Sequence, residues 1–569
     1  MLDFLKYKRR SEIVFFNVTA KMNVIVRNGF AENAEVIQPD ENGRYFLKRG
    51  VYSFDVFGEE LCAVHKVFVV KKENLGEQIC IELPEIPFTN KESEYKGPVF
   101  LFTDELEKKL YDIENLNEID ESIFDTPAFE PGKAVNQFTT NDEKKEYLRK
   151  ILKNCDYAYM DETTYPFPVV FFAKEVLKKG MTDQEIFDAM HENHKLNLFY
   201  HAQLHGTETP AGEGALTIAK KLTGEFGEKI LDKMNIVLVP CVNQKGNAEI
   251  VREKDGIDLN RDFLRTSTKE IQELHRIFYK LMPEVTVDGH TWTRANLFQK
   301  NDLRRTLFDV RISAANSLNM DESLAEIDEE MTLFAQNECR KAGFRTGYYG
   351  AGINRSHSKT YYSLSPCCSI VFECEGTRSA KYHFKRNVWA QHKGITSIFQ
   401  YVYEHSELIQ EKVNCVRENV KAGKYIHDGK FVIKQKRSGT KKYVNYIDNY
   451  DFYGRLVKKN AKVCYYKFDI PIKVLQTPTA FIIEKKEMEE KWISFFKEIH
   501  GVCSEEKILE KDLNMISLKG KEDVCLKKGT EVYWFPCDQL QVQVMEALFV
   551  ESYREFEVKK EDGIYAYYE

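Results

Sequence analysis

Long apolar runs and long unbroken blocks of basic residues are missing from this sequence. No stretch approaches the roughly 20 apolar residues that a membrane-spanning helix needs. No long block of Lys and Arg is present either, so a nucleic acid is not the expected partner. The N-terminus, MLDFLKYKRRSEIVFF, places its basic residues after a short apolar patch, whereas a secretory signal has them before a longer one. We expect no membrane association.

Paired cysteine motifs are missing as well. The 13 cysteines are an odd number without zinc-finger spacing, and Cys367 and Cys368 are adjacent. Reduced thiols in a cytoplasmic protein explain this usage best. We therefore expect a cytoplasmic location and no cysteine among the metal ligands.

The composition that is present is typical of a folded protein with large cores. Hydrophobic residues make up 43% of the chain and charged residues 30%. A length of 569 residues exceeds one ordinary core and predicts about three or four domains. The formal net charge of -7 argues against a general polyanion binder.

Four regions are expected along the chain. Residues 1–90 hold many short runs of Val, Ile, Phe and Tyr between turn residues, which predicts a β-sandwich-like domain. Residues 91–140 are acidic and poorly periodic, as expected of a linker or wrapping segment. Residues 141–405 alternate helical and strand patterns, which is typical of an α/β domain. Residues 406–569 form a mixed C-terminal α/β accessory region in which a helix ends at Gly501.

Helices and strands are expected on both sides of the polar motifs in the α/β region. His201, inside an apolar run, is expected to pack in the core or to support a neighbouring ligand, and His275, between charged residues on a helix, is expected at the surface. The expected strands are 168–173, 196–203, 235–240, 284–290 and 369–375, and the expected helices are 183–193, 212–228, 269–281 and 321–342.

Two motifs predict a metal site. His205 and Glu208 follow the end of an apolar strand, three residues apart, and can converge on one ion. A second β-rich run ends in Asp288-Gly289-His290, and His290 can complete a set of two histidines and one carboxylate. Catalytic zinc uses three such protein ligands and keeps an open position for water. Asp288 is a candidate to orient His290.

Polar residues that could handle a substrate lie between and after these motifs. Asn260 and Arg261 offer an amide and a planar guanidinium together, which is a suitable arrangement for gripping a carboxylate. Arg252, one short loop upstream, is either a further substrate contact or a solvated loop charge. The apolar run 369–372 leads into Glu373 and Glu375, and a carboxylate at a strand end can act as general base and then general acid.

The four segments HxxE, NR, DxH and strand–Glu, in this order, resemble the zinc metallocarboxypeptidase family with its carboxypeptidase A-like fold. The resemblance covers about residues 145–400. It implies a mixed-sheet α/β catalytic domain with one zinc ion per chain on His205, Glu208 and His290.

The same resemblance assigns the substrate-handling residues. It implies Glu373 as the catalytic carboxylate, since the family's carboxylate falls directly after the apolar run; strand alternation alone does not separate it from Glu375. It implies that Arg252 polarises the scissile carbonyl and that Asn260 and Arg261 hold the C-terminal carboxylate of the substrate.

Two features of the resemblance stay open. The family places a tyrosine over the substrate, and Tyr348, Tyr349, Tyr361 and Tyr362 all lie in range. The stretch 347–366, which contains Arg355, His357 and Lys359, is where the family reads the terminal side chain of the substrate. Those cations indicate either a polar or acidic preference or a solvated loop.

The expected function is hydrolysis of the C-terminal peptide bond of a peptide or protein by a zinc metallopeptidase. One alternative is a zinc-dependent deacylase of N-acyl amino acids, an aspartoacylase-like enzyme that shares the same motifs. Another is a non-catalytic binding module, which the complete set of ligands and base disfavours. The extra β regions favour a longer ligand than an acylase takes.

Overall fold

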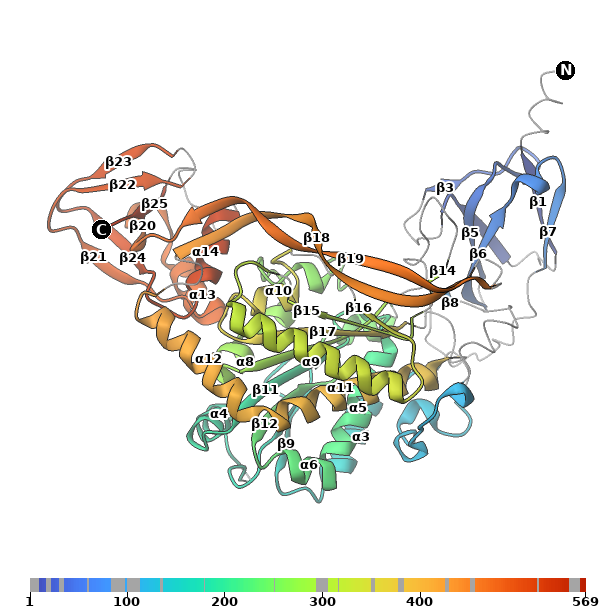
Figure 1. Cartoon of the computed structure of the whole chain (residues 1–569), viewed down its shortest axis with the longest axis horizontal. Coiled ribbons are helices and arrows are strands. Elements are labelled where there is room, and N and C mark those ends of the chain that lie inside the picture. The colour runs from blue at the N-terminus through green and yellow to red at the C-terminus, as the bar shows by residue number, and fades with distance from the viewer. Residues whose placement is uncertain are drawn as a thin grey trace.

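The computed structural model is shown in Figure 1. It describes residues 10–16, 22–29, 35–58, 61–82, 98–99, 113–133, 137–178, 180–249, 251–292, 305–306, 308–315, 317–348, 354–376, 383–424, 429–450, 456–518, 521–551 and 563–569.

An eight-stranded sheet forms the centre of the molecule, in the order β16-β15-β17-β13-β11-β12-β10-β9. The four adjacent strands β17, β13, β11 and β12 run parallel, and antiparallel pairs join β15 and β10 to them, so the predicted mixed-sheet α/β fold is confirmed. The strands are β9 Ala158–Asp161, β10 Val169–Phe172, β11 Leu196–Ala202, β12 Met234–Val239, β13 Val285–Trp292, β15 Val310–Ala314, β16 Thr346–Tyr348 and β17 Cys368–Glu375.

Helices cover this sheet on both faces, which is why its central strands are buried apolar runs rather than alternating ones (Figure 1). Three of the predicted helices agree closely with α4, α8 and α9, whereas the predicted helix 212–228 is two helices that meet at Gly224. The helices are α3 Asn141–Leu152, α4 Asp183–Glu192, α5 Thr209–Leu222, α6 Glu225–Ile230, α7 Gln244–Glu249, α8 Lys269–Leu281, α9 Glu322–Lys341, α10 Ser358–Tyr362, α11 Phe384–Glu404 and α12 Ser406–Lys421.

Two small sheets lie near the N-terminus and share one apolar core. One has the order β4-β1-β7 and the other β3-β2-β5-β6-β8. Side chains from both sheets, such as Ile13 and Phe54, meet in that core, as in a sandwich. The strands are β1 Ser11–Phe16, β2 Met22–Arg27, β3 Val36–Ile37, β4 Tyr45–Leu47, β5 Gly50–Gly58, β6 Leu61–Val70, β7 Gln78–Glu82 and β8 Pro98–Val99.

A long hairpin connects distant parts of the molecule (Figure 1). Its strands are β18 Lys430–Tyr450 and β19 Leu456–Gln476, and the short strand β14 Arg305–Thr306 pairs with β18. Beyond the hairpin lies a six-stranded sheet with two helices, the first of which ends at Gly501 in a left-handed conformation, as the sequence predicts. These elements are β20 Ala480–Glu484, α13 Glu490–His500, β21 Glu505–Ile508, β22 Leu513–Ser517, β23 Asp523–Leu526, β24 Glu531–Pro536, α14 Val542–Glu551 and β25 Ile564–Tyr567.

The main apolar core extends through several of the predicted regions. It begins at Leu116 in the acidic segment, includes α12 through Val413, and continues to Ala566 in the C-terminal sheet. The acidic segment contributes backbone contacts as well, since Trp389 donates its indole N–H to Glu118 O at 2.7 Å. The boundaries drawn at residues 90, 140 and 405 stay predictions.

The expectation for His275 is wrong. Its side chain is fully buried and stacks on Tyr361 with ring centroids 4.4 Å apart. His500, at the end of α13, meets the imidazole edge-on with ring centroids 5.4 Å apart and hydrogen-bonds Tyr361 at 2.7 Å. The charged neighbours of His275 in the sequence gave no sign that α13 packs over this helix.

Among the helices of the described residues, none combines the length and apolar character needed to cross a membrane.

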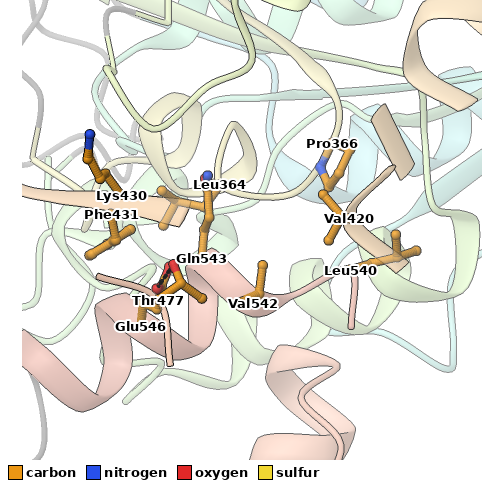
Figure 2. Close-up of a pocket in the computed structure, with 10 residues that line it drawn as sticks. All are labelled: Leu364, Pro366, Val420, Lys430, Phe431, Thr477, Leu540, Val542, Gln543 and Glu546. Carbon is orange, nitrogen blue, oxygen red and sulfur yellow. Dashed lines mark hydrogen bonds between the residues drawn. The ribbon is translucent and has the colours of Figure 1, made fainter. Parts of the chain in front are cut away.

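A small pocket lies where α12, the hairpin and α14 meet (Figure 2). Glu546 lines it, fully buried, and accepts a hydrogen bond of 2.6 Å from Thr477 Oγ1. Burial raises the pKa of Glu546 to about 8, because desolvation disfavours the charged carboxylate more than Thr477 and Arg355 stabilise it. The pocket is lined by Leu364, Pro366, Val420, Lys430, Phe431, Thr477, Leu540, Val542, Gln543 and Glu546.

This raised pKa predicts a pH dependence of stability. The ordinary pKa of 4.5 rises to about 8 on folding, so the folded state binds the proton more tightly than the unfolded state. The contribution of Glu546 is fully present below the unfolded pKa and is lost as pH rises through about 8.

Glu546→Gln keeps the shape of the side chain and removes its titration. The melting temperature of the variant, relative to that of the original chain, should therefore rise as the pH goes from 5 to 8. Parallel thermal melts across that range measure the effect. Glu510→Gln, at an exposed position, serves as the matched control and should show no pH-dependent difference. A constant offset for Glu546→Gln at all pH values would contradict the prediction.

Candidate metal centre

The loop that follows β11 is shaped by two backbone constraints. Gln203 has a positive φ of 56°, and its side chain fixes the loop by donating to Gly206 O at 3.0 Å and accepting from Lys144 Nζ at 2.9 Å. At Gly206 a Cβ would lie 2.0 Å from the backbone carbon of Gly246, so only glycine fits there. The loop therefore returns the chain sharply from the strand end to the start of α5.

That turn brings the three predicted ligands together. His205 follows β11, Glu208 directly precedes α5, and His290 lies on β13. The two oxygens of Glu208 divide between the histidines: Oε1 lies 2.7 Å from His205 Nδ1 and Oε2 lies 2.8 Å from His290 Nδ1. All three side chains are buried, and one ligand atom from each lies within 4.8 Å of the others.

The outer nitrogen of each histidine faces a second carboxylate. His205 Nε2 is 2.9 Å from Asp258 Oδ1, and His290 Nε2 is 2.8 Å from Asp288 Oδ2. A carboxylate on Nε2 holds the proton on that nitrogen and turns the lone pair of Nδ1 toward a metal. Asp288 thus lies where an orienting residue was expected.

Charge distribution in the cluster follows from burial and proximity. Burial raises the pKa of Glu208, but His205 and His290 outweigh it, and the pKa lies well below its usual value. Burial lowers the pKa of His290, but Asp288 and Glu208 outweigh it, and that pKa lies well above its usual value. The cluster therefore concentrates negative charge on Glu208 and Asp288, which favours a cation between the imidazoles.

This donor set fits zinc. Two imidazole nitrogens and one carboxylate oxygen are a set that zinc accepts in catalytic sites, and both histidines have the carboxylate partner on the outer nitrogen that such ligands usually have. Among the described residues it is the only group of three such side chains close enough to hold one metal ion.

The predicted substrate residues lie around this cluster and differ in how far their side chains are already bonded within the protein. Asn260 is already engaged, since its Oδ1 accepts from Ser358 N at 2.9 Å and its Nδ2 lies 3.0 Å from His290 Nε2. Arg261 is half exposed; its guanidinium donates to the carbonyl of Asn260 and is 4.0 Å from Asp258. Arg252 lies 3.5 Å from Glu208 Oε1 and 3.2 Å from Asp258 Oδ2.

Glu373 lies beside the cluster on the neighbouring strand. It is in register with His290 across the β13–β17 pair, whereas Glu375 is in register with Trp292, two positions further on. Burial raises the pKa of Glu373, and Arg311 opposes this rise by donating from NH2 to Oε2 at 2.9 Å.

Three of the four candidate tyrosines point into packed regions. Tyr348 stacks on Tyr443 with ring centroids 3.8 Å apart, Tyr361 bonds His500, and Tyr362 stacks on Phe278 at 4.3 Å. The fourth, Tyr349, lies outside the described residues.

Sequence reasoning missed Asp258 and Arg311. Asp258 had a local signal, because it stands two residues before Asn260 and its Oδ1 accepts the backbone N–H of that residue at 2.9 Å. Arg311 had none: it reaches Glu373 through the antiparallel pairing of β15 with β17, and its guanidinium lies 4.2 Å from the ring centroid of Trp292.

Comparison with known proteins agrees with the site. The profile of the family described as "Zinc carboxypeptidase" matches residues 175–277. That segment includes the HxxE and NR motifs and ends before His290. The resemblance to zinc metallocarboxypeptidases, expected from the four motifs, is confirmed.

Curated relatives that match the chain are also named carboxypeptidases. Carboxypeptidase 2 of Trichophyton rubrum is 26% identical over 212 residues, which cover 34% of this chain and 39% of the relative. Probable carboxypeptidase 2 of Arthroderma benhamiae is 26% identical over 215 residues, which cover 34% of this chain and 40% of the relative. The match therefore spans only about 40% of the length of these relatives.

Solved structures with similar parts include a metallocarboxypeptidase. One from Burkholderia cenocepacia has a TM-score of 0.36 at 13% identity and covers 46% of this chain and 68% of its own. Bovine thrombin-activatable fibrinolysis inhibitor, solved with tick carboxypeptidase inhibitor, has a TM-score of 0.37 at 13% identity and covers 48% and 99%. Both scores are low, and the order of the strands in the central sheet is what defines the fold.

The geometry predicts one zinc ion per chain. His205→Ala and His290→Ala should each lose the metal, because each variant keeps only two of the three protein ligands that a catalytic zinc site needs. Asp258→Asn should keep the ligands but weaken zinc affinity by about 10- to 100-fold, since the outer carboxylate no longer orients His205.

Metal analysis of protein purified without added zinc, followed by chelator competition, measures both effects. His191→Ala, at an exposed histidine on α4, is the control and should retain the metal. If His205→Ala and His290→Ala bind zinc as tightly as the original chain, the ligand set is wrong.

Proposed function

We propose that this chain is a zinc-dependent metallocarboxypeptidase that hydrolyses the C-terminal peptide bond of a peptide or protein. The observation that carries the proposal is the cluster of His205, Glu208 and His290, with Glu373 in register beside it. The matches to zinc carboxypeptidases support the same reaction class.

The three ligands would hold the zinc ion, with Nδ1 of each histidine and the Glu208 carboxylate as donors. Zinc in such a site supplies Lewis-acid polarisation of a carbonyl and lowers the pKa of water. Asp258 and Asp288 keep the imidazoles in the tautomer that this arrangement needs.

Glu373 is the proposed general base. Arg311 occupies Oε2, so Oε1 is the oxygen placed to take a proton from the attacking water and to return it to the leaving amine. The raised pKa of Glu373 suits both steps, because a carboxyl group with a higher pKa takes up a proton more readily and can still return it. Its position beside His290 favours it over Glu375.

Arg261 and Arg252 are the proposed contacts to the substrate. The half-exposed guanidinium of Arg261 is available for the free α-carboxylate, and Asn260 anchors the same turn through its bonds near Ser358 and His290. We propose that Arg252, 3.5 Å from Glu208 Oε1, polarises the scissile carbonyl. A cytoplasmic location is part of the proposal and rests on the cysteine usage of the sequence.

Glu373→Gln removes the proton acceptor and keeps nearly the same shape. We expect zinc to stay bound and the turnover of peptides to fall by about a hundredfold to ten-thousandfold. Glu375→Gln is the matched comparison on the same strand and should lose much less. An inactive Glu375→Gln together with an active Glu373→Gln would reverse the assignment.

Capping the C-terminus of a peptide as an amide should slow its hydrolysis at least about tenfold, because a charge-assisted, bidentate contact to Arg261 is lost. Arg261→Ala should remove most of this discrimination, and Arg261→Lys should restore little of it. Mass spectrometry of the products from matched free and amidated pentapeptides measures both rates. Equal rates for the original chain would rule out the exopeptidase proposal, and cleavage of small N-acyl amino acids alone would favour the deacylase.

A further inference from the structure

Lys359 is a buried cation close to the candidate site. It lies on α10, one residue after Ser358, whose hydroxyl donates to Asp288. Its Nζ donates to Ser313 Oγ at 2.9 Å and to Ala314 O at 2.8 Å, both of them neutral oxygens. No carboxylate of the described residues lies within 4.0 Å of it.

The ammonium group reaches the face of the sheet that carries Glu373. Ser313 is in register with Val371, two positions before Glu373 on β17, so all three side chains belong to one face. Burial lowers the pKa of Lys359 to about 7, although Asp328, Glu373 and Asp288 act against this shift from a distance. An ammonium held there without an anion is poorly compensated, and a carboxylate delivered by a ligand would supply the missing charge.

The hairpin β18–β19 carries a second and separate group of cations. Nine of its Lys and Arg residues are exposed, and among the described residues none of the nine forms an ion pair, although the chain as a whole has a net charge of -7. They are Lys430, Lys434, Lys436, Arg437, Lys441, Lys442, Lys459, Lys462 and Lys473.

Two of these cations, Lys434 and Lys436, lie on the side of the hairpin that faces away from the protein, which we call its outer side. Lys434 and Lys436 flank Gln435, which is buried and accepts from Leu318 N at 3.1 Å. Lys434 also lies directly opposite Lys473 in the antiparallel register. Like charges in facing positions destabilise a strand pair, and a bound anion would relieve that repulsion.

The inner side of the hairpin packs on the segment that leads to Lys359. Asn445 exchanges hydrogen bonds with the backbone of Tyr348, at 2.7 and 3.1 Å, and Arg355 donates to the carbonyls of Val432 and Ile433. Arg355 precedes Lys359 by four residues. The hairpin and the buried ammonium are therefore joined through one short stretch, and Figure 1 shows the hairpin running above α10 and the edge of the central sheet.

From these two independent observations we infer that the substrate is a polypeptide with an acidic C-terminus. Lys359 receives the side-chain carboxylate of the terminal Glu or Asp, and the outer side of the hairpin binds an acidic stretch further along the same polypeptide. The inference rests on the proposed function and specifies its substrate class.

Terminal preference tests the role of Lys359. Peptides with one neutral sequence and a terminal Glu, Gln or Leu should differ in kcat/KM, with Glu at least tenfold ahead of Gln. Lys359→Met should abolish this preference by lowering kcat/KM for the Glu peptide toward that for the Gln peptide, and Lys359→Arg should keep part of it. Thermal melts check folding; Met matches the length of the buried stem and removes a poorly paired charge. Equal rates on Glu and Gln peptides, or an unchanged preference in Lys359→Met, would overturn this assignment.

Binding tests the hairpin and does not depend on turnover. With the Glu373→Gln variant, fluorescence anisotropy should show a labelled Glu-rich peptide binding at least tenfold more tightly than its Gln-rich counterpart, with a strong dependence on salt. Lys434→Glu combined with Lys436→Glu should remove most of that difference, and the first of these substitutions places a carboxylate opposite Lys473, which should preserve the hairpin. The control is Lys511→Glu combined with Lys528→Glu, at exposed positions in the turns between strands of the C-terminal sheet.

The outcomes separate the inference from the proposed function. The acidic-polypeptide inference fails if Glu-rich and Gln-rich peptides bind equally. It also fails if single-stranded DNA of 20 nucleotides displaces the Glu-rich peptide more effectively than poly-glutamate does. This DNA is about as long as the hairpin strands, which have ~21 residues each at ~3.4 Å per residue. Acidic binding without hydrolysis of any peptide by the original chain would instead contradict the proposed function and leave the recognition of acidic polypeptides supported.

Discussion

The carboxylate of Glu208 bridges His205, in the loop after β11, and His290, on β13, and the geometry of the site depends on this bridge. Each oxygen meets one Nδ1, and Oε2 also accepts the backbone N–H of Thr291 at 2.9 Å. A carboxylate with both oxygens engaged has little rotational freedom. The end of β11, the start of α5 and the middle of β13 are therefore held in one arrangement before any ion arrives, which is the preorganisation that a metal site needs.

A second layer of charge supports the first. Asp258 and Asp288 face the outer nitrogens, and each is held in turn by other groups: Arg252 and the Asn260 backbone for Asp258, and the hydroxyl of Ser358 for Asp288. Buried carboxylates are costly unless they are paired in this way. The cost of burying them is offset by the positive charge that the imidazoles and an ion bring to the centre.

Motifs local in sequence were predictable, and contacts made through the sheet were not. HxxE and DxH each lie at the end of an apolar strand, and parallel strands bring their carboxyl ends to one edge, so the gathering of His205, Glu208 and His290 followed from spacing. Arg311 could not be predicted because it reaches Glu373 from β15, an antiparallel neighbour of β17 in the same sheet. His275 was misplaced because α13, more than 200 residues later, covers it. The sequence could not single out one of the candidate tyrosines, because they differ in burial and not in residue type.

The apolar core that runs from Leu116 to Ala566 ties the site to the far end of the chain. Residues that share one close-packed core tend to unfold together, in a single cooperative transition. Free energy gained by an ion at the histidines is then distributed to every element in that unit, because a ligand that binds only the folded state stabilises all of it. An ion held by His205, Glu208 and His290 would thereby help the C-terminal sheet to resist heat and proteolysis, although none of these three residues lies within that sheet.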